Sequence, residues 1–157
     1  MMNRPETTPQ DEPLSKKRLR LWLKLLKASN LIEDEVRRRL RHRCTSTLPR
    51  FDVMSVLDRA PQGMKMNEIS KLLRVSSGNI TGIVDKLTEE GLALRVAVPG
   101  DRRANLVRLT AKGQAAFAEQ AASHETWIDE ILGGLSADDI DGMIRRLDHL
   151  TNSLEEQ

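Results

Sequence analysis

The chain has 157 residues, enough for one domain with an ordinary buried core. A single cysteine and the lack of any long apolar run predict a cytoplasmic protein without disulfides or membrane-spanning segments. Aromatic residues make up only 3% of the sequence, which argues against a single-strand binder that stacks bases on aromatic side chains. The net charge of +2 is segregated, since residues 14–50 carry +9 and residues 114–157 carry −8. This indicates a face that meets a polyanion, the alternative being solvated helix faces that happen to differ.

The first part of the chain predicts a tail followed by a long helix. Residues 1–13 contain three prolines and no apolar periodicity, so we expect a mobile tail there. From Leu14 to about Arg43, apolar residues recur at helical spacing along more than one side. A helix of this kind needs more than one packing partner.

The middle of the chain predicts a helix-turn-helix. A short helix is expected after Thr47, a capping residue, and ends before Pro61. Two further helices, Met66–Leu73 and Ser76–Glu90, are separated by a two-residue connection, and Gly91 occupies the position where helices often stop. Two short helices joined by a tight turn are typical of this DNA-binding motif.

The helix Ser76–Glu90 has two unlike faces. Its apolar residues follow the spacing of one packed face: Ile80, Ile83, Val84 and Leu87. The other face is small and polar, with Gly82 near the middle of the helix, where glycine costs about 1 kcal/mol relative to alanine. Nothing on that face suggests a packing reason for Gly82, so we expect another surface to approach it closely.

A β-hairpin is expected next. Leu92–Val98 alternates apolar and other residues, and Asn105–Leu109 supplies a second strand after the Pro99-Gly100 turn. The predicted hairpin tip, Gly100–Ala104, carries two arginines. A helix flanked by a basic hairpin tip is typical of proteins that bind duplex DNA.

The C-terminal third predicts two more helices, capped by Thr110 and Ser136 and separated by Gly133-Gly134. The first has a coiled-coil-like stripe of Phe117, Ala121, His124, Ile128 and Ile131. Together with the first helix, these stripes exceed what a small winged motif can cover, so we expect a homodimer, with an intrachain bundle as the alternative. We therefore assign residues 14–46 and 110–157 to dimerisation and residues 47–109 to DNA binding.

The sequence from about Leu14 to Leu150 resembles the MarR family of bacterial winged helix-turn-helix regulators. The resemblance rests on the order and spacing of Ser76–Leu87, Glu90-Gly91-Leu92, Asp101-Arg102-Arg103 and Val107–Gly113. Leu21–Leu26 and Ser77–Gly82 look like the branch that controls aromatic-acid (hydroxycinnamate-type) catabolism. The resemblance implies a mainly α fold with a small β-hairpin wing and an intertwined homodimer through the N- and C-terminal helices. It also implies a repressor released by a small aromatic acid or its coenzyme A thioester.

In such a dimer the Ser76–Glu90 helices enter successive major grooves about 34 Å apart, so double-stranded DNA with an inverted-repeat operator is the expected partner. The predicted DNA-binding residues are Ser76, Ser77, Asn79, Thr81, Lys86, Asp101, Arg102 and Arg103. Asn79 is the candidate for reading adenine, unless its side chain caps the helix instead. Lys86 and Arg102 are expected on phosphates. By resemblance, Arg103 enters the minor groove with Asp101 holding its guanidinium, the alternative being a solvated turn.

For the effector, the family places a cavity where the first, second and fifth helices meet. The candidates are Trp22, Leu26, Ser29, Arg50, Phe51 and Met54. The basic run Arg37, Arg38 and Arg39 is a solvated helix end, a phosphate contact or a site for an anionic effector. The alternative for each of the six pocket candidates is a plain core or surface position, and Ser29 could simply bond a carbonyl of its own helix.

Other chemistries find little support. Cys44 permits a thiol-responsive regulator, although an ordinary free thiol is the simpler reading. The histidines lack metal-ligand spacing, and no phosphate loop, nucleophile elbow or paired-carboxylate motif is present, so we predict no metal, no cofactor and no enzyme. The remaining alternatives are a ligand-insensitive architectural DNA-binding protein and a winged module used for protein contact.

Overall fold

The computed structural model describes residues 12–157, apart from the side chains of residues 102–104. The predicted tail therefore lies almost wholly outside the described residues. The chain divides into two compact units, the first ending at Leu48 and the second running from Pro49 to Gln157.

The first unit is dominated by one helix, α1, Leu14–Arg43, as predicted. Cationic side chains in its last turn complement the negative end of the helix dipole. Val36 and Leu40 are buried, whereas the large apolar side chains of the N-terminal half are exposed apart from Leu25, which is half-buried; Trp22 is 56% exposed. The apolar stripe of α1 is therefore covered only toward its C-terminal end.

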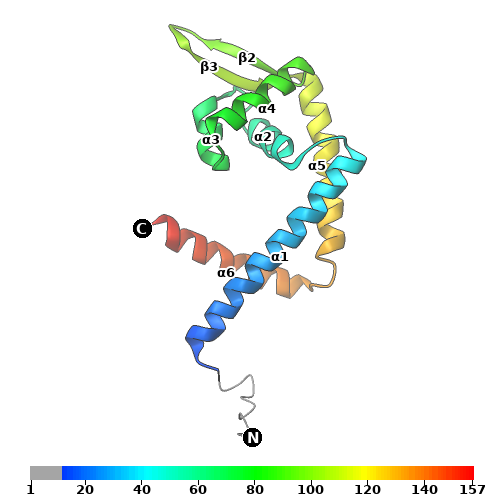
Figure 1. The fold of residues 1–157 in the computed structure, drawn as a ribbon, viewed down its shortest axis with the longest axis vertical. Helices are drawn as coiled ribbons and strands as arrows, with labels where there is room; N and C mark the ends of the chain where they lie inside the picture. Colours follow the sequence, from blue (N-terminus) through cyan, green and yellow to red (C-terminus); the bar gives the residue numbers. More distant parts are fainter. Residues whose placement is uncertain (1–11) are drawn as a thin grey trace, which may run out of the picture. The chain divides into compact units, whose positions relative to one another are not determined.

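The second unit contains the predicted helix-turn-helix: α2 (Leu48–Asp58), α3 (Met66–Leu73) and α4 (Ser77–Glu89). In Figure 1 these helices lie together beside a β-hairpin. The buried side chains of these three helices are all apolar: Phe51, Val53, Met54, Leu57, Ile69, Ile80, Val84 and Leu87. The inward face predicted for α4 is confirmed, with Ile83 only half-buried.

A small antiparallel sheet completes the winged motif. Its strands, β1 (Met64–Lys65), β2 (Ala93–Val98) and β3 (Asp101–Leu109), have the order β1-β3-β2. The sequence did not predict β1, because two residues are too short to display alternation.

The hairpin tip is tighter than predicted. Strand β3 already begins at Asp101, which lies opposite Val98, so the turn is Pro99-Gly100 and the range Gly100–Ala104 was wrong. Gly100 has φ +84°, a conformation that favours glycine. The register then shifts, since Ala97 pairs with Asn105. Residues 102–104 are thus accommodated on β3 within an irregular section of the ladder.

The C-terminal helices are α5 (Ala111–Ile131) and α6 (Ala137–Glu155). Both predicted caps are confirmed, since Thr110 Oγ1 accepts from Gly113 N at 3.0 Å and Ser136 Oγ from Asp139 N at 3.2 Å. Helix α5 buries Trp127, which the predicted stripe omitted. Helix α6 exposes all of its large apolar side chains: Ile140, Met143, Ile144, Leu147, Leu150 and Leu154. Within residues 12–157, no helix has the length and apolar composition needed to cross a membrane.

Candidate nucleic-acid interface

The start of α4 is fixed by local hydrogen bonds. Arg74 ends α3 in the left-handed region with φ +52°, and Ser70 Oγ donates to the carbonyl oxygen of Val75. Ser76 is the N-cap of α4, because its Oγ accepts from Asn79 N at 3.3 Å. The cap is therefore Ser76, as predicted, and the side chain of Asn79 does not perform it. Asn79 is exposed at the edge of the helix.

The outward face of α4 is open. Ser77, Thr81 and Lys86 are all exposed. A Cβ atom added at Gly78 or Gly82 would meet nothing within 4 Å. Within the described part of the chain, neither glycine is therefore required by internal packing. The face that carries them has no bulky side chain at these two positions, so another surface can approach it closely.

The predicted wing residues are only partly described. Asp101 is exposed, whereas the side chains of Arg102 and Arg103 lie outside the described residues, as does any contact between Asp101 and Arg103. A contact that the sequence did not predict joins α4 to the wing, where Arg95 of β2 forms an ion pair with Asp85 of α4. This pair offsets a carboxylate on a helix that is expected to face phosphate.

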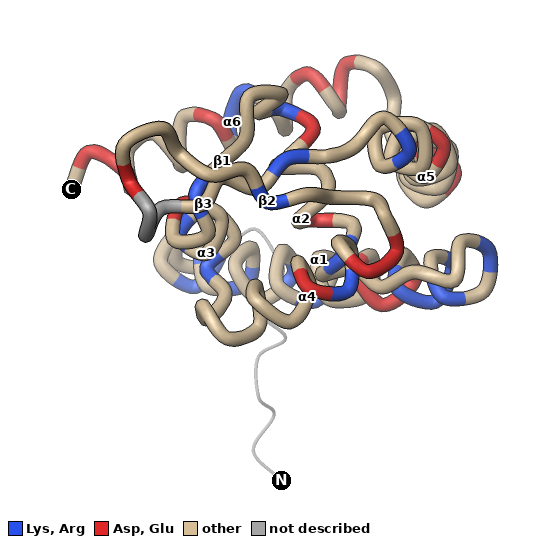
Figure 2. The backbone as a smooth tube through the Cα atoms, turned by 90° about the horizontal axis from the view of Figure 1, so that it is seen from above, with Lys and Arg blue, Asp and Glu red and all other residues tan. Residues whose placement is uncertain are grey.

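The winged motif carries further cations that sequence reasoning did not single out. Lys71 and Arg74 are exposed at the end of α3 and in the following turn. Helix α3 itself carries one lysine and one glutamate, and β2 carries one arginine, while α6 carries several acidic positions (Figure 2). The position of Arg74 in the turn before α4 was a usable signal, because such turns lie near the reading helix.

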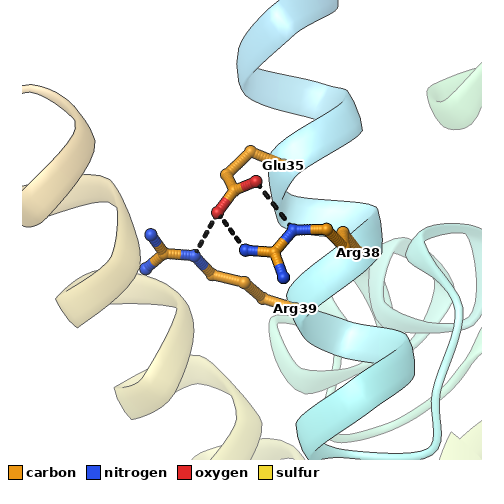
Figure 3. Close-up of polar contacts among 3 residues, drawn as sticks. All are labelled: Glu35, Arg38 and Arg39. Carbon is orange, nitrogen blue, oxygen red and sulfur yellow. Dashed lines mark hydrogen bonds and ion pairs between the residues drawn. The ribbon is translucent and has the colours of Figure 1, made fainter.

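The arginine run of α1 is neutralised within its own helix. Glu35 accepts from Arg38 Nη2 and from Arg39 Nε, each at 2.7 Å (Figure 3). These hydrogen bonds, first from Arg38 and then from Arg39, lower the pKa of Glu35 to about 2. Arg37 lies 3.5 Å from Glu33 and 3.6 Å from Asp34. The acids one turn earlier were visible in the sequence, and their i,i+3 and i,i+4 spacing predicts this network.

The remaining effector candidates lie in different surroundings. On α1, Trp22, Leu26 and Ser29 are exposed. In the second unit Phe51 and Met54 are buried, and the Phe51 ring lies 5.4 Å from that of Phe117 and 4.9 Å from that of His124, measured between centroids. Arg50 pairs with Glu90, which was also not predicted.

A cavity of about 850 Å³ lies elsewhere, between α5 and α6. Its apolar lining includes Ile128, Leu132 and Ile140, and Glu125 and Asp129 add carboxylates. It contains none of the predicted effector residues. Among the described residues no cluster of His, Cys, Asp or Glu has the arrangement of a metal site. Cys44 is half-buried at the end of α1.

Comparisons with known proteins agree with this geometry. The family model described as MarR family matches residues 47–104, which cover α2, α3, α4 and β2. The HTH-type transcriptional regulator MhqR of Bacillus subtilis (strain 168) is 28% identical over 128 residues, covering 82% of this chain and 87% of that protein.

Solved structures extend the match over nearly the whole chain. A MarR family transcriptional regulator from Silicibacter pomeroyi has a TM-score of 0.75 at 26% identity, covering 92% of this chain and 99% of that one. FabT of Streptococcus pneumoniae, in complex with DNA, has a TM-score of 0.73 at 26% identity, covering 88% of this chain and 98% of that one. MhqR and the Silicibacter pomeroyi protein are transcriptional regulators, in agreement with the prediction that the chain is not an enzyme. Residues 47–104 thus match the MarR family, and the chain has the winged helix-turn-helix fold of MarR-family transcriptional regulators.

Proposed function

We propose that this regulator binds an inverted-repeat operator as a homodimer and represses transcription until a small aromatic acid or its coenzyme A thioester releases it. The observation that carries the DNA-binding part is the open face of α4, where Gly78 and Gly82 have no neighbour that their missing Cβ atoms would touch. A helix that loses about 1 kcal/mol at Gly82 without an internal packing gain is suited to close approach by a groove wall.

The proposed contacts divide into reading and positioning. Ser77, Asn79 and Thr81 face the base edges, and the exposed amide of Asn79 pairs with an adenine because it offers one donor and one acceptor. Lys86 and Arg102 contact phosphates. Ser76 aims the positive end of the helix dipole at the backbone. On the wing, Arg103 enters the minor groove, with Asp101 as its partner.

The homodimer is supported by apolar surface that the single chain leaves uncovered. The N-terminal half of α1 and all of α6 expose large aliphatic side chains, in amounts that a monomer in water rarely shows. We therefore assign residues 14–46 and 110–157 to dimerisation and residues 47–109 to DNA binding. A dimer also supplies the second reading helix that an inverted repeat requires.

The effector part rests on family likeness. The effector-binding residues that this likeness implies are Trp22, Leu26, Ser29, Arg50, Phe51 and Met54, with Arg37, Arg38 and Arg39 receiving the anionic group of a thioester. Because these arginines are paired with Glu33, Asp34 and Glu35, an anionic effector has to replace those partners. Replacing all three arginines by glutamine is expected to weaken the effector response more than operator affinity, whereas equal loss of both removes them from the effector site.

The test begins with selection of duplexes from a random-sequence pool at physiological salt. We expect an inverted repeat to be enriched, and we expect one member of a panel of aromatic acids and their coenzyme A thioesters to release it. Enrichment without release by any compound contradicts the effector part alone. Binding with no sequence preference contradicts specific recognition and favours an architectural role, and no duplex binding favours a module for protein contact.

A further inference from the structure

The C-terminal end of α4 is held by a side chain from α2. Arg50 Nη1 donates to Glu90 Oε1 at 3.1 Å, and Nη2 contacts Oε2 of the same carboxylate. Only 18% of the Arg50 side chain is exposed, against 47% for Glu90. Two parallel contacts between a planar guanidinium and a carboxylate fix direction as well as distance.

Local helix energetics do not favour an acid at this position. Glu90 is the C-cap of α4, where the helix dipole disfavours negative charge. The helix ends without help from that carboxylate, because Gly91 at φ +72° and Leu92 N bonded to Leu87 O at 2.8 Å form a Schellman motif. The role of the Glu90 side chain is therefore its tertiary contact with Arg50.

The backbone of the same turn is fastened from α5. Lys112 Nζ donates to the carbonyl oxygen of Glu90 at 3.0 Å. Thr110 Oγ1 donates to the carbonyl oxygen of Gly91 at 2.7 Å. The backbone N–H of Thr110 donates to the carbonyl oxygen of Leu92 at 3.0 Å. Glycine is required at position 113, because a Cβ atom on Gly113 would lie 1.9 Å from the carbonyl oxygen of Leu92. The Arg50 contact adds an attachment from α2 to a turn whose backbone is held from the other side by Thr110 and Lys112.

We propose that Arg50 and Glu90 are positioning residues for operator reading, because their paired contact sets the angle at which the open face of α4 meets DNA. The inference rests on the proposed function, and neither side chain touches DNA in it. Sequence-specific contacts depend on that angle, whereas attraction to phosphates depends mainly on charge.

The substitution Glu90→Gln distinguishes a positioning role from a charge effect, because the two roles predict opposite changes in operator affinity. Removing a negative charge from a DNA-binding motif tightens binding to any duplex if charge alone matters. Loss of the pair weakens operator binding if Arg50 and Glu90 position α4. Arg50→Lys keeps the charge and removes the fork of two donors. Glu89→Gln is the matched control, because Glu89 is an exposed acid next in sequence on the same helix.

The experiment measures the dissociation constants of the full chain for the selected operator and for a scrambled duplex of equal length, at one salt concentration. We expect Glu90→Gln and Arg50→Lys to lower the ratio of specific to non-specific affinity by about three- to tenfold, and Glu89→Gln to leave it unchanged. The exchanged pair Arg50→Glu with Glu90→Arg is expected to recover most of the ratio, which a misfolded variant does not.

An unchanged or raised ratio in Glu90→Gln overturns the inference while leaving operator binding by the parent intact. If the parent selects no sequence, the proposed function is overturned and the inference with it. The two failures are therefore distinguishable.

Discussion

Replacing Gly82 by alanine is expected to stabilise the protein and weaken its operator binding. An added Cβ meets nothing within 4 Å in the described residues, so the folded chain accommodates it without strain. Alanine is favoured over glycine inside a helix by about 1 kcal/mol, which for a chain of 157 residues raises Tm by roughly 2–4 °C. If the groove wall approaches Gly82 closely, the same methyl group costs about 1–3 kcal/mol on binding, a roughly 5- to 150-fold loss of affinity.

The assay pairs thermal unfolding with operator titration for the parent and Gly82→Ala. Gly78→Ala is the companion variant, since its added Cβ also meets open space but lies in the first turn of α4. Binding to a scrambled duplex reports any general loss of phosphate attraction. A Gly82→Ala protein that is more stable and binds operator as tightly as the parent refutes the reasoning, because DNA then does not approach this part of the helix.

Three further predictions concern single side chains. Asn79→Ala is expected to relax the preference for adenine at one position in each half-site by about 1–3 kcal/mol, without lowering Tm because Ser76 supplies the cap. Selection from operators randomised at that position measures the preference. An unaltered preference would mean that Asn79 does not read a base. Arg102→Ala is expected to reduce the dependence of log affinity on log salt by about one, and Arg103→Ala to weaken operator most where A·T pairs narrow the minor groove; salt titrations that match the parent for both variants place the wing away from DNA. Hydrogen bonding from Arg50 lowers the pKa of Glu90 below its usual 4.5, so this stabilisation is present above pH 4.5 and lost as the pH falls through the lowered value. Denaturant unfolding across that acid range is expected to show a smaller loss for Glu90→Gln than for the parent, and equal losses contradict it.

Local signals carried much of the fold. Ser76, Thr110 and Ser136 predicted helix starts correctly because a capping hydroxyl acts within three residues of itself. Gly91 marked the end of α4 because its positive φ is a local requirement. The open face of α4 followed from helical spacing alone.

Tertiary contacts were harder to predict. The Arg50–Glu90 pair joins residues forty positions apart, and no periodicity links them. The two-residue strand β1 exists only through its pairing with β3. Trp127 is buried although it lies off the stripe predicted for α5, because helix burial depends on which elements surround it and not on one heptad pattern.

The central claim is that two copies of α4 read two half-sites on one side of the duplex. The most direct test inserts five base pairs between the half-sites of the selected operator, which rotates one of them by about half a turn. We predict that the altered duplex binds the regulator no more tightly than a single half-site does. Equal affinity for the parent and five-base-pair operators would contradict the dimeric reading of DNA by α4.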